Sequence, residues 1–297
     1  MVERALGLGD FAPSGLDVAI LDLEDGVPLP EKANARGAIA AALAGTEAGP
    51  ARFVRINRSG RDRDADLAGV VRPGLDGIVA PKIDDANEVR ELLDALGARE
   101  SSAGLAQGSI RVIASIESAR GLLEARAIAA ASDRVIALLF GAEDFALDLG
   151  LPADREAEAA DLLYARSAVV IAAVASGCQA IDGIWPVVAD VDGLRRDALT
   201  ARRLGFSGKS LIHPGHIEAV NEVFSPSPDE VDHARQIVKA FEEAAARGHG
   251  AIALDGKLLD APIVDRARRT LALDKAIAAK QRTPPVERPA ALEGKLF

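Results

Sequence analysis

The sequence predicts an α/β fold of the TIM (β/α)₈-barrel type, and three observations support this prediction. Short runs rich in Val and Ile recur along the chain, each followed by a longer stretch of helical character. The runs are nearly continuous apolar segments, as expected for parallel strands that helices cover. The length of 297 residues lies within the range of a single barrel. A doubly wound parallel sheet is the alternative arrangement for the same pattern.

Seven strand segments precede residue 225. In order, they span residues 17–22, 52–57, 77–81, 111–116, 135–140, 179–184 and 208–212. Amphipathic segments between them predict helices, among them 85–96, 121–131 and 162–175. Because a complete barrel has eight strands, one strand is missing from this count.

The pattern changes after residue 224, so we divide the chain into a barrel domain (1–224), a C-terminal appendage (225–280) and a tail (281–297). Ser227 and Glu230 form a capping box that predicts a helix over 228–248. An Asp-Gly turn between 251–254 and 257–259 predicts a hairpin, and a second helix is expected over 261–280. The prolines of the tail predict disorder.

Composition excludes several classes of function. The net charge of −10 argues against a nucleic-acid partner, since phosphate binding needs a clustered basic face. The longest apolar runs are too short for a membrane span, and the N-terminus does not resemble a secretory signal. The single cysteine, Cys178, cannot form an internal disulfide and reads as a core residue, so we expect a reducing, cytoplasmic location.

Acidic residues follow several of the predicted strands. Asp22, Glu24 and Asp25 end the first strand, Glu117 follows the fourth, and Asp144 follows the fifth. In a parallel α/β protein, such strand ends surround the functional site. Two carboxylates from different strand ends can bind Mg²⁺, so Glu117 and Asp144 are predicted metal ligands. The alternative is that each acid caps the next helix or pairs with an arginine.

Arg55 is the most unusual residue within a predicted strand. Alternation places Phe53, Arg55 and Asn57 on one face of the strand. A buried guanidinium needs anionic partners, and its fork suits a substrate carboxylate. An internal ion pair with Asp22 or Glu24 is the equal alternative.

Three acids at one strand end are costly without a neighbouring cation, for which Mg²⁺, Arg55 and Arg36 are the candidates. His213 precedes Pro214 and reads as a loop residue. The glycine-containing segment 205–210 lacks the spacing of a phosphate loop and precedes its strand, so we reject that function.

A set of motifs occurs in one order along the chain. They are Asp22-Leu23-Glu24-Asp25-Gly26-Val27, Lys32, Arg36, Val54-Arg55-Ile56-Asn57, Ile116-Glu117-Ser118, Gly141-Ala142-Glu143-Asp144 and Gly208-Lys209-Ser210-Leu211-Ile212-His213-Pro214. Over roughly residues 17–278, this order resembles the citrate lyase beta subunit-like branch of the HpcH/HpaI aldolase/citrate lyase superfamily.

The resemblance implies a Mg²⁺-dependent TIM barrel that acts on CoA thioesters as a homotrimer or hexamer. The expected reaction cleaves a citryl-, malyl- or citramalyl-CoA to an acyl-CoA and a 2-oxo acid, or runs in reverse. Glu117 and Asp144 match the metal ligands of the family, and Arg55 matches the arginine that holds the substrate carboxylate. Glu117, Glu24 and Asp25 are expected to lie against the substrate.

A C-terminal segment also resembles the family. Residues 256–262 look like the segment that supplies an acid/base aspartate to a neighbouring subunit, which makes Asp260, with Arg55, a candidate catalytic residue. A helix N-cap is the equal alternative for Asp260. Lys32, Arg36, Arg58, Arg61 and Arg63 could supply a positive rim for the CoA anion, and ordinary solvated charges are the alternative for most of them.

Two departures from the family pattern bear on function. CoA-free class II aldolases of the superfamily typically carry His where this chain has Asp25, which favours a CoA-ester lyase over a CoA-free pyruvate aldolase. Family members usually open with a strand ending near Val-Pro-Gly, whereas this chain opens on the following helix. We therefore expect the barrel to lack its first strand, and a non-catalytic subunit of a lyase complex is a further alternative.

Overall fold

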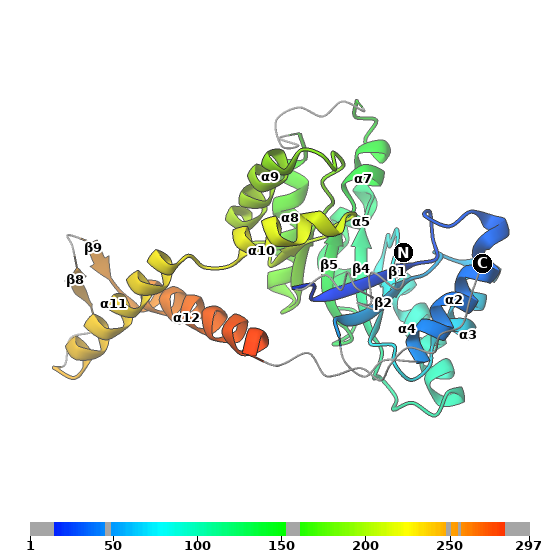
Figure 1. The fold of residues 1–297 in the computed structure, drawn as a ribbon, viewed down its shortest axis with the longest axis horizontal. Helices are drawn as coiled ribbons and strands as arrows, with labels where there is room; N and C mark the ends of the chain where they lie inside the picture. The colour runs from blue at the N-terminus through cyan, green and yellow to red at the C-terminus, as the bar shows by residue number, and fades with distance from the viewer. Residues whose placement is uncertain (1–14, 45–48, 153–160, 248–250, 255–256, 283–297) are drawn as a thin grey trace. The chain divides into compact units, whose positions relative to one another are not determined.

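A computed structural model describes residues 15–44, 49–152, 161–247, 251–254 and 257–282 (Figure 1). The chain divides into two compact units, Met1–Phe224 and Ser225–Phe297.

The first unit is built on a seven-stranded parallel sheet in the order β1-β2-β3-β4-β5-β6-β7. Its strands are β1 (Val18–Asp22), β2 (Ala51–Arg55), β3 (Gly77–Ala80), β4 (Arg111–Ile116), β5 (Val135–Phe140), β6 (Gln179–Asp182) and β7 (Gly208–Lys209). All seven predicted strands are confirmed, and because neighbouring strands are parallel, their carboxyl ends lie at one edge. In β1 and β2, Asp22 is the register partner of Arg55.

Helices connect the strands and pack against the face of the sheet that the large core cluster covers, α2 to α4 near the first strands and α8 and α9 near the last ones (Figure 1). They are η1 (Leu29–Glu31), α2 (Lys32–Ala44), α3 (Gly60–Val70), α4 (Ala86–Ser102), α5 (Ala119–Leu123), α6 (Ala125–Ala129), α7 (Ala142–Asp148), α8 (Leu163–Ala175), α9 (Val191–Leu204), η3 (Pro214–His216) and α10 (Ile217–Phe224).

Several predicted boundaries were wrong, among them the end of β2 at Arg55 instead of residue 57 and the end of α4 at Ser102 instead of residue 96. The single helix expected over 121–131 is the pair α5 and α6, with Glu124 between them at φ −97° and ψ 1°. β6 and β7 end at Asp182 and Lys209, earlier than expected. The apolar residues beyond them serve another purpose, since Trp185 and Leu211 pack against the helical cluster that contains Leu194.

The core has two layers, which follow from the alternation of side chains along each strand. Val54 and Ile56 belong to the large cluster between the sheet and the helices. Phe53 belongs to a second buried cluster made of strand residues, with Val79, Ile113 and Ala137. This second cluster fills the concave side of the sheet, as in a barrel interior. Arg55 shares the face of Phe53 and therefore points to the interior side at the carboxyl end.

One hydrogen bond links the segment before β1 to the helix that follows β7. The side chain of Asn221, in α10, donates a hydrogen bond to the carbonyl oxygen of Gly15, just before β1 (2.9 Å). Within the described residues, β1 and β7 form the edges of the sheet. The prediction of a missing first strand concerns residues 1–14, which lie outside the described residues.

The second unit contains α11 (Pro228–Ala245), the antiparallel strands β8 (Ile252–Leu254) and β9 (Lys257–Leu259), and α12 (Ala261–Arg282). The predicted capping box of Ser227 and Glu230 is present. Helices α11 and α12 share a small buried cluster that includes Ile237 and Val264. The helix α12 includes residues 281 and 282, where the disordered tail was expected to begin; 283–297 lie outside the described residues. No described helix is long and apolar enough to cross a membrane.

Candidate functional site

Charged side chains gather at the carboxyl ends of the first five strands. Five are carboxylates, and the two cations among them come from β2 and the residues after β3. The set is Asp22, Glu24, Asp25, Arg55, Lys82, Glu117 and Asp144. The fold therefore brings together every barrel residue that the sequence predicted for the site, and adds Lys82.

Arg55 forms the internal ion pair that was one of its two predicted roles. Its Nε and Nη2 donate to Oδ1 and Oδ2 of Asp22 at 2.7 and 2.6 Å, and Nη1 lies 3.2 Å from Oε2 of Glu24. Burial alone would raise the pKa of Asp22, but hydrogen bonds from Arg55 and from the backbone of Glu24 and Gly26 lower it. The Arg55 side chain is 29% exposed, so a ligand can still reach the guanidinium.

Two basic residues expected near these acids have other partners. Arg36 contacts Asp66 (2.6 Å) and Asp62 (2.8 Å), so the prediction that it could neutralise the strand-end acids was wrong. Lys32 is buried, and its Nζ donates to Oδ1 of Asn57 and to backbone carbonyl oxygens after β1. It joins the ends of β1 and β2, so its assignment to a positive rim was also wrong. A basic group can be placed by sequence but not assigned to one acid among many.

Lys82 is the functional candidate that sequence reasoning missed. Its Nζ lies 2.7 Å from Asp25, 2.9 Å from Glu24 and 3.9 Å from Asp144. Burial would lower the pKa of Lys82, but hydrogen bonds to Asp25 and Glu24 raise it instead. A signal did exist, because Lys82 directly follows the predicted strand 77–81, where polar side chains point to the site.

Glu117 is the most buried of the predicted metal ligands. Its Oε2 accepts a hydrogen bond from the backbone N–H of Lys82 at 3.1 Å. Burial first, and then the nearby carboxylates of Glu24 and Asp144, raise the pKa of Glu117 to about 7, although Lys82 and Arg55 act in the opposite direction. The group is therefore a carboxylate that lacks sufficient positive charge around it.

Asp144 lies in the first turn of α7, directly after β5, and its side chain is 38% exposed. Asp144 is among the charges that raise the pKa of Glu117. Carboxylate oxygens are the donors that Mg²⁺ prefers, and it commonly uses one or two protein carboxylates with water and substrate. Within the described ranges, no group of three or more His, Cys, Asp and Glu residues could hold a metal ion. A two-carboxylate Mg²⁺ site fits the residues present.

Asp260 directly precedes α12 in the second unit. One carboxylate oxygen accepts a long hydrogen bond from the N–H of Ile263, at 3.4 Å. The N-cap interpretation thus has a contact to support it, and the catalytic interpretation stays a prediction.

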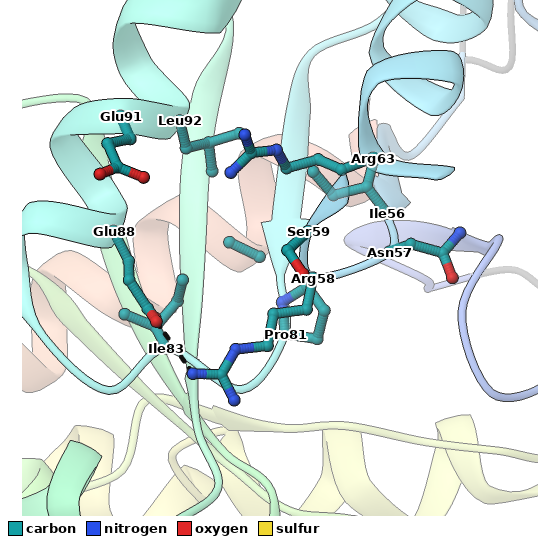
Figure 2. Close-up of a pocket in the computed structure, with 11 residues that line it drawn as sticks. Ile56, Asn57, Arg58, Ser59, Arg63, Pro81, Ile83, Glu88, Glu91 and Leu92 are labelled. Atoms are coloured by element: carbon teal, nitrogen blue, oxygen red, sulfur yellow. Dashed lines mark hydrogen bonds and ion pairs between the residues drawn. The ribbon is translucent and has the colours of Figure 1, made fainter. Parts of the chain in front are cut away.

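A cavity of about 430 Å³, including open solvent, lies beside the charged cluster, between the ends of β2 and β3 and helix α4 (Figure 2). Arg58 and Arg63 line it, as do Glu88 and Glu91. Figure 2 shows Arg58 paired with Glu88, at 2.9 Å. Two of the predicted rim residues therefore meet at one cavity, and acidic neighbours offset their charge.

A second cavity of about 530 Å³, including open solvent, lies at the ends of β5 and β6. Its floor contains a buried network in which Arg166 and Lys209 each contact both Asp182 and Asp197. Sequence reasoning did not find this network, because its members are far apart in the chain and each looks ordinary alone. Its two positive and two negative charges balance. We therefore interpret it as a structural network that holds β6 and β7 to helices α8 and α9.

Two residues judged structural from sequence make contacts of a structural kind. The Nδ1 atom of His213 accepts a hydrogen bond from the N–H of Gly215, at 3.1 Å, and so caps the start of η3. Cys178 packs against the main core, and burial raises its pKa.

The family model described as HpcH/HpaI aldolase/citrate lyase matches residues 3–214, more than half of the chain. The chain belongs to this family. All the barrel residues of the charged cluster lie within the matched part of the HpcH/HpaI chain.

Other members of the HpcH/HpaI family match over nearly the whole length. Citrate lyase subunit beta of Leuconostoc mesenteroides subsp. cremoris is 38% identical over 266 residues, which cover 88% of this chain and 87% of that protein. The mitochondrial citramalyl-CoA lyase of Homo sapiens is 33% identical, covering 89% of this chain and 81% of that one. The crystal structure of protein CitE from Mycobacterium tuberculosis in complex with magnesium, acetoacetate and coenzyme A matches with a TM-score of 0.73 at 31% identity, covering 92% and 95% of the two chains.

Proposed function

We propose that this chain is a Mg²⁺-dependent carbon–carbon lyase. It cleaves a β-hydroxyacyl-CoA of the citryl-, malyl- or citramalyl-CoA type to an acyl-CoA and a 2-oxo acid, or catalyses the reverse. The observation that carries the proposal is the meeting of Glu117, Asp144 and Arg55 at the carboxyl ends of β4, β5 and β2, on one edge of the sheet. The named activities of the citrate lyase and citramalyl-CoA lyase relatives support the same chemistry.

Glu117 and Asp144 would hold the metal. When bound, Mg²⁺ would supply a Lewis acid for the substrate hydroxyl oxygen that must lose its proton before cleavage and, in the reverse reaction, for the carbonyl oxygen of the 2-oxo acid, which gains negative charge as the carbon–carbon bond forms. The magnesium in the related CitE structure supports this choice of cation. Glu117 is well suited, because a dication would stabilise the carboxylate form that its surroundings now disfavour.

Arg55 binds the carboxylate of the 2-oxo acid. Its hydrogen bonds to Asp22 fix the direction of the guanidinium, while its contact with Glu24 is an ion pair in which Oε2 of Glu24 accepts no hydrogen bond. The Nη1 side of the Arg55 guanidinium, toward Glu24, is thus held less firmly than the side that binds Asp22. Glu24 and Asp25 line the substrate site beside Lys82.

Asp260 of a neighbouring copy moves the proton at the acyl α-carbon, in a homotrimer or hexamer that works in the cytoplasm. The likeness of residues 256–262 to the family segment supports this role. The long Asp260–Ile263 hydrogen bond also leaves the carboxylate available for another partner.

The test is a panel of citryl-, malyl- and citramalyl-CoA, with acyl-CoA release followed by mass spectrometry with Mg²⁺ and with excess EDTA. We expect cleavage of at least one thioester, its loss in EDTA, and a loss of 100-fold or more (~3 kcal/mol) in Asp144→Asn. Cleavage of 4-hydroxy-2-oxo acids without any thioester would instead identify a CoA-free pyruvate aldolase. A chain that binds no Mg²⁺ and cleaves neither class would be a non-catalytic lyase-complex subunit.

A further inference from the structure

Lys82 holds a central position among the carboxylates of the site. Its ammonium contacts Glu24, Asp25 and Asp144, and its backbone N–H donates to Glu117. One residue therefore touches both proposed metal ligands and both acids after β1. Such contacts on every side are not those of a solvated surface lysine.

The charges around Lys82 do not balance. Asp22 is neutralised by the paired hydrogen bonds from Arg55. The other four carboxylates, Glu24, Asp25, Glu117 and Asp144, are left with the Lys82 ammonium and with the contact that Arg55 makes to Glu24 at 3.2 Å. The site thus retains negative charge for a metal cation, but the lysine already takes part of it.

The backbone shows that this position is held in place. Lys82 has φ +53°, the left-handed region, and no other non-glycine residue among those described has a positive φ. An L-residue adopts this conformation only when its surroundings compensate the strain. Here the compensation comes from the hydrogen bond to Glu117 and the carboxylate contacts of Nζ.

We propose that Lys82 is a built-in counter-cation that shares Asp144 with the metal, weakening Mg²⁺ binding and strengthening binding of the anionic 2-oxo acid. The inference rests on the proposed function and extends it to the balance between metal and substrate. A positive charge near a dication lowers metal affinity, and the same charge attracts the carboxylate that must bind beside the metal. Lys82 is thus a positioning and charge-setting residue in this site.

The experiment compares the full-length wild type with Lys82→Met, which keeps the chain length of the side chain and removes the charge. Calorimetry measures MgCl₂ binding to the metal-free protein, and then pyruvate binding to the Mg²⁺-saturated protein. In Lys82→Met, we expect the Kd for Mg²⁺ to fall about 5- to 10-fold and the Kd for pyruvate to rise by a similar factor. A residue with a merely structural role would weaken both ligands.

Two variants control for charge and one for folding. Arg111→Met removes a positive charge at the opposite, exposed end of β4 and should leave both constants unchanged. Lys82→Arg keeps the charge and should stay within about twofold of the wild type. If Lys82→Met does not fold, Lys82→Gly replaces it, because glycine accepts the positive φ without strain. As in Lys82→Met, the Kd for Mg²⁺ should fall and the Kd for pyruvate should rise.

The outcomes separate this inference from the proposed function. If the wild type binds Mg²⁺ but Lys82→Met leaves both Kd values unchanged or raises both, the counter-cation role is contradicted and the proposed function is not. An effect of Arg111→Met equal to that of Lys82→Met contradicts the role in the same way. Failure of the wild type to bind Mg²⁺ contradicts the metal site, and the inference with it.

Discussion

At the scale of one residue, Glu117 shows how burial and neighbouring charges set the pKa of a carboxylate. Its place after the fourth strand could be predicted, because polar residues at strand ends point to the site. The charges that raise its pKa could not be predicted, because Glu24 follows β1 and Asp144 lies in α7, both distant in sequence from Glu117. Arg55 makes the same point: alternation placed it on the interior face, but only register could choose Asp22 as its partner.

Glu117 also gives a prediction on stability and pH in the metal-free protein. Its pKa is about 7 in the folded state against an ordinary 4.5, so the folded state binds the extra proton between these values. The free energy of unfolding should therefore fall as pH rises from about 4.5 through 7. Glu117→Gln removes this effect and should stabilise the metal-free chain at pH 8 by on the order of 1 to 3 kcal/mol.

Urea denaturation of both proteins in EDTA at pH 5 and pH 8 measures the effect. The difference should be small at pH 5 and should grow toward pH 8. Glu91→Gln, at an exposed position of α4, is the matched control and should change little at either pH. A constant difference across the pH range would show that the ionisation of Glu117 is not its cause.

At the scale of elements, the site depends on how closely the end of β4 approaches the end of β5. Gly141 follows β5, and a Cβ there would lie 2.2 Å from Cγ of Glu117. Its φ of −93° suits any residue, so the need for glycine is spatial. The sequence showed that Gly141 follows a strand. It did not show that the side chain of Glu117, after β4, occupies the space beside this glycine.

Gly141→Ala should therefore displace Glu117 and weaken Mg²⁺ binding. We expect at least a tenfold rise in the Kd measured by calorimetry, which corresponds to ~1.4 kcal/mol or more. Gly37→Ala is the control, since nothing lies within 4 Å of a Cβ at that position in α2. An unchanged Kd in Gly141→Ala would mean that Glu117 either moves freely or does not bind the metal.

Strand existence was predicted better than strand length. All seven strands follow from apolar runs, because burial on both faces leaves a strong signal. The ends of β6 and β7 were misplaced, because residues such as Leu211 are apolar for packing against helices. An apolar run reports burial and not the element that provides it.

At the scale of the whole molecule, the proposed site needs two copies of the chain, one giving Arg55 and the other Asp260. Arg55→Met and Asp260→Asn should each be inactive alone in the thioester assay. When the two are denatured, mixed and refolded together, activity should return to about one quarter of the wild type for random assembly of a closed ring.

Refolding each variant separately and then mixing without denaturation is the control, and should give much less activity. If co-refolding restores nothing, while wild type treated in the same way recovers activity, Asp260 does not act across subunits. Wild-type activity in Asp260→Asn alone would support the helix N-cap as its whole role.

The most direct measurement of the central claim is a crystal structure of the chain soaked with Mn²⁺, whose anomalous signal marks the metal position. We predict one strong peak at the carboxylates of Glu117 and Asp144, near Arg55, and its absence in Asp144→Asn. A peak elsewhere in the barrel, or no peak in a wild-type crystal at saturating Mn²⁺, would contradict the proposed metal site.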